Sequence, residues 1–153
     1  MEEEDVRARL AVALERVVQQ DLHLLEVDVS ERCIASRLAM YLQEQFPEHH
    51  VDVEYNRDAE TPKRLALPEE CANYWDHDGR AFVVPDVIIH RRGAAGPNLL
   101  ILELKKTTNQ TPRDCDYVRV QAFRAQFEYS FGALIECETR KGREPGIAIS
   151  AWL

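Results

Sequence analysis

Two carboxylates and one lysine stand inside two strongly apolar runs of the sequence. Asp86 lies within residues 82–89 (FVVPDVII). Glu103 and Lys105 lie within residues 99–105 (LLILELK). Near-continuous aliphatic runs of this length are typical of strands that are covered on both faces. Because an ionised carboxylate in such a strand needs a paired charge or a metal ion, these residues indicate a functional site.

The segment between the two runs predicts how they pair. Residues 91–98 (RRGAAGPN) carry glycines and a proline that suit the reversal of an antiparallel pair. A hairpin centred on this turn places Asp86 opposite Glu103, with their Cβ atoms roughly 5 Å apart. Lys105 shares the face of Glu103 because side chains alternate along a strand. Two facing carboxylates repel each other unless a positive charge lies between them, and a divalent cation is the simplest candidate.

This set of side chains suits metal-dependent hydrolysis of a phosphodiester. Carboxylate oxygens are hard ligands of the kind that Mg²⁺ or Mn²⁺ prefers, and one or two of them suffice when water and substrate phosphate complete the coordination. Such a metal polarises the phosphoryl oxygen and generates hydroxide from water. Two roles are open to Lys105: it positions or deprotonates the attacking water, or it stabilises the charge that develops on the phosphate.

The remaining elements follow from the spacing of apolar residues and from Ser30, which is a favourable residue for a helix start. The predicted elements are helices over residues 2–20 and 30–46, a strand over 51–55, the two apolar strands, a helix over 113–130, and strands over 132–136 and 146–152. This order predicts one α/β domain, residues 1–153, with a mixed sheet flanked by helices. Residues 57–79 show no periodicity and are long for an idle loop, so we expect a flap or a partner-binding element there.

At these residues the chain resembles the PD-(D/E)XK nuclease superfamily, which has the restriction-endonuclease-like fold. The Pro-Asp pair at 85–86 matches the first half of the signature, and Glu-Leu-Lys at 103–105 matches the second half on the following strand. The predicted elements from residue 30 to about residue 138 extend the resemblance. Their combination is similar to that of Holliday junction resolvases and of small bacterial proteins of unassigned activity. The resemblance implies the core order αβββαβ, preceded here by an extra helix.

The resemblance also implies roles for particular residues. Asp86 and Glu103 would be the principal metal ligands, joined by Glu31 and by the backbone carbonyl of Leu104, and Lys105 would be the catalytic lysine. For Glu31 there is a competing explanation, because an acidic residue in a first helical turn is favoured by the helix dipole without any function.

Two residues of the helix over 113–130 are candidates for substrate binding. Gln121 best matches the glutamine that exonuclease-like branches of the superfamily carry on this helix, but position 125 is alanine where their pattern has tyrosine. That departure favours an endonuclease. Arg119 is a second candidate, together with Asp116 and Arg124, and exposed helical charge is the alternative explanation for all three.

Composition bounds the partners and the location of the protein. The chain has 153 residues and a net charge of -8, so it repels nucleic acid at long range. Basic residues concentrate around and after the hairpin, where they form either a phosphate-binding rim or a solvated face: Arg91, Arg92, Lys105, Lys106, Arg113, Arg119 and Arg124. An acidic N-terminus and apolar runs well short of the ~18 residues of a membrane span predict a cytoplasmic protein with no membrane partner. The four cysteines show no metal-ligand spacing, which favours reduced thiols over disulfides.

The sequence therefore predicts a divalent-metal-dependent nuclease that acts on nucleic acid, on DNA rather than RNA, as an endonuclease. Two cuts on a duplex usually need two active sites, so a homodimer or a partner protein fits this activity. One alternative is a catalytically weak or silent nuclease-like module that binds a protein or nucleic-acid partner through residues 57–79, and the net acidity favours it. Another is a purely structural network of buried charges, which is disfavoured by its cost.

Overall fold

Five strands form a mixed sheet among the residues that the structure describes. This computed structural model describes residues 1–55, 67–71, 74–75, 81–82, 84–94 and 98–153. In spatial order, the strands of the sheet are β1 (His50–Val53), β4 (Val87–His90), β5 (Asn98–Lys106), β6 (Tyr129–Glu138) and β7 (Gly146–Trp152). The short strands β2 (Tyr74–Trp75) and β3 (Ala81–Phe82) pair with each other in a separate sheet.

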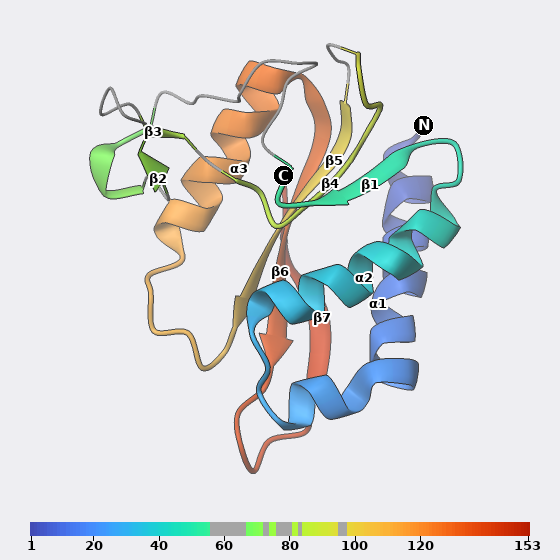
Figure 1. The fold of residues 1–153 in the computed structure, drawn as a ribbon, viewed down its shortest axis with the longest axis vertical. Helices are drawn as coiled ribbons and strands as arrows, with labels where there is room; N and C mark the ends of the chain where they lie inside the picture. The colour runs from blue at the N-terminus through green and yellow to red at the C-terminus, as the bar shows by residue number, and fades with distance from the viewer. Residues whose placement is uncertain (56–66, 72–73, 76–80, 83, 95–97) are drawn as a thin grey trace.

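Helices cover both faces of the five-stranded sheet. They are α1 (Glu3–Glu26), α2 (Glu31–Gln45) and α3 (Asp114–Phe127), and a short 3-10 helix, η1 (Glu69–Cys71), precedes β2. Figure 1 shows α1 and α2 on one side of the sheet and α3 on the other. The predicted mixed sheet flanked by helices is confirmed. None of the helices in the described part of the chain is both long enough and apolar enough to cross a membrane.

The alternation of side chains along β5 decides what each face of the sheet carries. Leu104 points into the core that the sheet shares with α1 and α2. Ile101 points the other way and packs in a second cluster with Phe123 of α3. Glu103 and Lys105 follow Ile101 on that face, as predicted, because strand residues two apart share a face. The strand therefore presents two charged residues beneath the first half of α3.

The predicted hairpin register is confirmed. β4 and β5 are antiparallel, with Val87 opposite Leu102 and Ile89 opposite Leu100. β5 pairs in parallel with β6 on its other side, and α3 makes the connection between them. One step beyond Val87 and Leu102, this register brings Asp86 level with Glu103.

The apolar run over 82–89 is not one strand, which corrects the sequence prediction. β4 begins only at Val87. Proline has no backbone N–H to give to a sheet ladder, so Pro85 is unsuited to the middle of a paired strand. Asp86 takes over where the ladder stops: its side-chain Oδ2 accepts a hydrogen bond of 2.7 Å from the backbone N–H of Leu104. The end of β4 thus exposes a stretch of the β5 edge and places a carboxylate on it.

The helix starts follow the predictions closely, but two helix ends differ. The helix predicted over 113–130 ends at Phe127, because the next strand, predicted over 132–136, already begins at Tyr129 and runs to Glu138. Ser30 caps α2, because its hydroxyl accepts a hydrogen bond from the Cys33 N–H. The first helix continues beyond residue 20 to Glu26, past non-helical backbone angles at Asp21. Of the predicted flap over 57–79, the structure describes residues 67–71 and 74–75, and the rest of that prediction lies outside the described residues.

We expect Gly132→Ala to lower the free energy of unfolding by about 1–3 kcal/mol, because α3 packs directly on β6 at this point. A Cβ on Gly132 would collide with Val120 Cγ1 and would lie 3.1 Å from Arg124 Cδ. Gly146→Ala is the matched control, since a Cβ on Gly146 would meet nothing within 4 Å. Urea denaturation of the two variants measures the difference, and equal midpoints would contradict the close packing of α3.

Candidate active site

An acidic pocket of about 740 Å³ lies between β5, α3, η1 and the start of α2. Its charged lining residues are the acidic Glu31, Glu70, Asp86, Glu103, Asp114 and Asp116 and the basic Lys105 and Arg119. The five residues that carry the predicted metal and catalytic roles, Glu31, Asp86, Glu103, Leu104 and Lys105, all line this pocket. Six carboxylates against two bases make the pocket attractive to a cation and repellent to a bare phosphate.

Several oxygen atoms lie along the exposed edge of β5. The Leu104 N–H donates to Asp86 Oδ2 and the Lys106 N–H donates to Glu31 Oε2, each at 2.7 Å. The N–H and C=O of one strand residue point to the same side of the strand, so the Leu104 carbonyl lies on this edge between the two donors. Asp86, Glu31 and the Leu104 carbonyl therefore place oxygen atoms along this edge. Carboxylate and carbonyl oxygens are the ligands that hard divalent cations prefer.

Glu103 is a buried carboxylate that protein contacts satisfy only in part. It is 5% exposed, and its Oε1 has no hydrogen-bond partner among the described residues. Its Oε2 lies 3.7 Å from an Arg119 guanidinium nitrogen. Burial raises the pKa of Glu103 well above its usual range, the charge of Asp86 adds to the rise, and Arg119 opposes it. A buried acceptor of this kind normally has a partner, so the free oxygen indicates a ligand.

Asp86 is half-buried at the edge of the pocket. Burial raises its pKa to about 6; the hydrogen bond from the Leu104 N–H lowers the pKa, and the neighbouring Glu31 charge raises it. At neutral pH this carboxylate is therefore ionised at a cost in stability. A divalent cation beside Asp86 and Glu103 would offset that cost.

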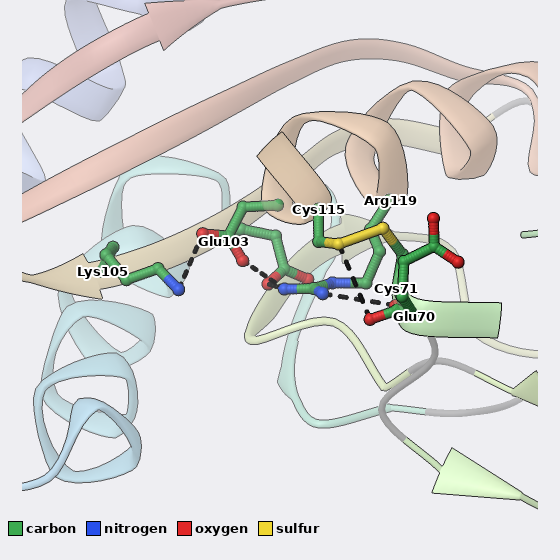
Figure 2. Close-up of a disulfide and its surroundings, with 7 residues drawn as sticks. Glu70, Cys71, Glu103, Lys105, Cys115 and Arg119 are labelled. Carbon is green, nitrogen blue, oxygen red and sulfur yellow. Dashed lines mark hydrogen bonds and ion pairs between the residues drawn. A yellow bond between two sulfur atoms is a disulfide. The ribbon is translucent and has the colours of Figure 1, made fainter. Parts of the chain in front are cut away.

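Asp116 is the residue of this pocket that sequence reasoning placed wrongly. The explanation of exposed helical charge is wrong for Asp116, because the residue is 4% exposed and its Oδ2 lies 2.8 Å from Lys105 Nζ. Its other oxygen pairs with Arg119. Figure 2 shows Lys105 and Glu103 on β5 and Arg119 on α3 turned toward one another. Arg119, a predicted substrate contact, thus belongs to the pocket, whereas the amide of Gln121 donates to the hydroxyl of Tyr117 outside it.

Asn109 is a further residue that the sequence did not reveal. Its amide donates to Glu31 Oε1 at 3.0 Å, and its own side-chain oxygen accepts from the Thr111 N–H. Glu31 is therefore held by Asn109 and by the Lys106 N–H together. The residue lies in the polar link after β5, where an asparagine is so common that its presence carries no signal.

A disulfide joins Cys71 to Cys115, which corrects the prediction of reduced thiols. Cys33 and Cys137 are free, as predicted. The bond ties η1 to the first turn of α3 at the rim of the pocket, where Arg119 also donates to the Cys71 carbonyl at 3.3 Å (Figure 2). The two cysteines are 44 residues apart, so no local spacing pattern predicts that they pair. Disulfides are rare in the cytosol, and the bond therefore weighs against the predicted cytoplasmic location.

Three bases of the suggested phosphate-binding rim are paired with carboxylates. Arg92 forms an ion pair with Asp52, Lys106 Nζ lies 2.9 Å from Asp28 Oδ1, and an Arg113 guanidinium nitrogen lies 2.7 Å from Glu136 Oε2. Arg124 turns away and donates to the Ser130 carbonyl. These contacts favour the explanation of a solvated, charge-balanced face for these bases.

The donor set of the pocket fits Mg²⁺ or Mn²⁺ completed by water. Among the described residues, no three His, Cys, Asp or Glu side chains converge closely enough to hold a metal ion by themselves. Magnesium, however, keeps several waters and is commonly bound through one or two carboxylates together with substrate phosphate. Asp86, Glu103 with its unpartnered oxygen, and the Leu104 carbonyl supply that kind of incomplete shell.

Comparison of this chain with known proteins and structures identifies no relative. No family model, no curated protein and no solved structure matches this chain. The resemblance to the PD-(D/E)XK superfamily accordingly stays a prediction, and the geometry of the pocket has to carry any functional assignment.

We expect Asp86→Asn to stabilise the metal-free protein by about 2 kcal/mol at about pH 8 and to give almost no gain at about pH 4. The folded-state pKa of Asp86 is raised to about 6. The folded protein therefore binds the proton more tightly than the unfolded chain, and stability is lost as the pH rises through this value. Asparagine keeps an acceptor for the Leu104 N–H but carries no charge.

The measurement is denaturant unfolding in the presence of a chelator at both pH values. The exposed Asp114→Asn serves as control and should change the free energy of unfolding by less than about 0.5 kcal/mol. A gain for Asp86→Asn that is equal at both pH values would mean that its charge is not the cause.

Proposed function

We propose that this protein is a divalent-metal-dependent nuclease of the PD-(D/E)XK type, with a restriction-endonuclease-like core, that hydrolyses phosphodiester bonds in DNA as an endonuclease. One observation carries the proposal. Asp86 and Glu103 meet at the point where β4 stops, beside the Leu104 carbonyl, and Lys105 stands on the same face as Glu103. The combination supports the proposal because it brings carboxylate oxygens suited to a metal and a positive group into one pocket.

The metal would be held by Asp86, Glu103 and the Leu104 carbonyl, with Glu31 alongside. When bound, Mg²⁺ or Mn²⁺ supplies Lewis acidity toward the phosphoryl oxygen and lowers the pKa of water. The charge of the pocket supports this need for a cation, because its six carboxylates would otherwise repel the phosphate. Residues of the chain perform the other tasks.

Lys105 and Arg119 are the positive side chains among the described residues that line the pocket. In the hydrolysis, a water oxygen attacks phosphorus and one ester P–O bond breaks, which leaves a phosphate monoester and a free hydroxyl. Lys105 orients the water or stabilises the negative charge on the phosphoryl oxygens, and Arg119 neutralises charge on the same group. Their burial strengthens both interactions.

The test is cleavage by the full chain of a four-way junction, a linear duplex, single-stranded DNA and duplex RNA, each with Mg²⁺, Mn²⁺ or a chelator. We expect nicking of DNA that depends on the metal and is absent with the chelator. Titration calorimetry with Mn²⁺ alone provides a second measurement that does not depend on finding the right substrate. If no substrate is cut and Mn²⁺ does not bind, the protein is a nuclease-like binding module.

Sedimentation with and without DNA tests the homodimer that two cuts on a duplex would use. A monomer that makes only nicks would restrict the proposal to single-strand cleavage.

A further inference from the structure

Asp116 is a buried carboxylate that holds both bases of the pocket. Its Oδ2 lies 2.8 Å from Lys105 Nζ, and its other oxygen pairs with Arg119. The side chain of Asp116 is 6% exposed, that of Lys105 11% and that of Arg119 13%. Removal of one partner from an ion pair shielded from water in this way is costly, because it leaves the others with an uncompensated charge.

Glu103 is a second buried carboxylate beside these two bases. It lies on β5 two residues before Lys105, on the same face, and its Oε2 is already 3.7 Å from Arg119. Its Oε1 has no hydrogen-bond partner among the described residues. A released lysine or guanidinium would therefore find an open acceptor at Glu103, and a cation side chain there would compete with a metal ion.

We propose that Asp116 is a positioning residue: as the shared counter-ion of Lys105 and Arg119, it keeps both bases from closing on Glu103 Oε1 and so leaves that oxygen open to a divalent cation. The inference rests on the proposed function, because it presumes a metal at Glu103. It assigns Asp116 no contact with metal or substrate. The residue acts through the bases that it holds.

Mn²⁺ affinity, measured by titration calorimetry on the full chain, tests this role without any substrate. We expect Asp116→Asn to weaken Mn²⁺ binding about tenfold, the size of one ion-pair coupling. Glu144→Gln is the control, since it removes one negative charge from an exposed position outside the pocket, and we expect it to change the affinity less than about twofold.

Two further variants separate positioning from a general loss of negative charge. Lys105→Met alone should change the affinity less than about twofold, because Asp116 already holds the lysine away from Glu103. The triple variant Asp116→Asn, Lys105→Met, Arg119→Met should bind Mn²⁺ within about threefold of wild type, since no base remains to occupy Glu103. Asp116→Glu should retain most of the affinity, because it restores a carboxylate.

The outcomes are distinct. If wild type does not bind Mn²⁺, the proposed function itself is overturned, and this inference with it. If wild type binds and Asp116→Asn binds equally well, only the positioning role is overturned. If Asp116→Asn does not fold, the triple variant decides, because it removes Asp116 together with both of the bases that it holds. Binding near the wild-type level supports positioning, and loss of binding makes Asp116 a ligand instead.

Discussion

Lys105→Ala should reduce metal-dependent DNA cleavage by about 10²–10⁴-fold while leaving Mn²⁺ binding nearly unchanged. The reason is the separation of charges in the pocket. Lys105 Nζ is held by Asp116 and not by the carboxylates that we propose as metal ligands. Its removal deprives the transition state of a positive group but leaves the oxygen ligands in place, so the loss falls on the rate of the chemical step.

Glu103→Gln should abolish both cleavage and Mn²⁺ binding. The amide is nearly isosteric with the carboxylate, yet it replaces one anionic oxygen by a donor that cannot ligate a cation. Because burial already raises the pKa of Glu103 well above its usual range, the substitution is not expected to unfold the protein. Glu103→Gln should therefore lose Mn²⁺ binding, as expected for a metal ligand. Lys105→Ala should lose only the cleavage rate, as expected for a catalytic group.

Single-turnover cleavage of the best DNA substrate and Mn²⁺ calorimetry measure this pair of effects. The exposed substitutions Lys141→Ala and Glu144→Gln are controls of the same charge type and should leave both measurements unchanged. A contaminating nuclease would cut equally in all preparations. Cleavage by Lys105→Ala at the wild-type rate would remove the lysine from the chemistry and leave a metal-binding protein without a known reaction.

The register of the candidate site could be predicted because it depends on local rules. Alternation along a strand and a turn of known centre are enough to place Asp86 level with Glu103 and to put Lys105 on the face of Glu103. The N-cap at Ser30 is local in the same sense, since one hydroxyl satisfies an N–H three residues later. Strand and helix starts of this kind need no knowledge of distant contacts.

The burial of Asp116 could not be predicted because it depends on distant contacts. The second half of α3 covers Ile101 with Phe123 and Phe127, which is an ordinary apolar contact. Further along the same face of β5, two and four residues after Ile101, lie Glu103 and Lys105. The first half of α3 contacts them with charged side chains. A helix whose inward face changes from polar to apolar along its length has no clear amphipathic pattern, so its polar half resembles solvent-exposed charge.

The disulfide illustrates the same limit. Spacing rules detect cysteines that are close in sequence, whereas Cys71 and Cys115 are brought together by η1 docking on the start of α3. The sequence shows that the segment over residues 57–79 is long, but it does not show that η1, within that segment, contacts α3. The pocket rim is consequently the part of the site about which the sequence says least.

Removal of this disulfide should be the largest single effect on stability that a rim substitution produces. We expect the double variant Cys71→Ser, Cys115→Ser to lower the free energy of unfolding by about 3–4 kcal/mol, because a cross-link that closes a long loop restricts the unfolded chain strongly. The two residues are separated by 44 positions. The free thiol Cys33 provides the control, and Cys33→Ser should have an effect of less than about 1 kcal/mol.

Denaturant unfolding with and without a reducing agent distinguishes the bond from the thiols themselves. Reduction should destabilise wild type and Cys33→Ser to the level of the double variant and should leave the double variant unchanged. Loss of the bond also frees η1, whose Cys71 carbonyl accepts from Arg119. If wild type unfolds at the same midpoint under both conditions and its mass shows four free thiols, the rim is not cross-linked. The contact between η1 and Arg119 then depends on that hydrogen bond and on packing alone.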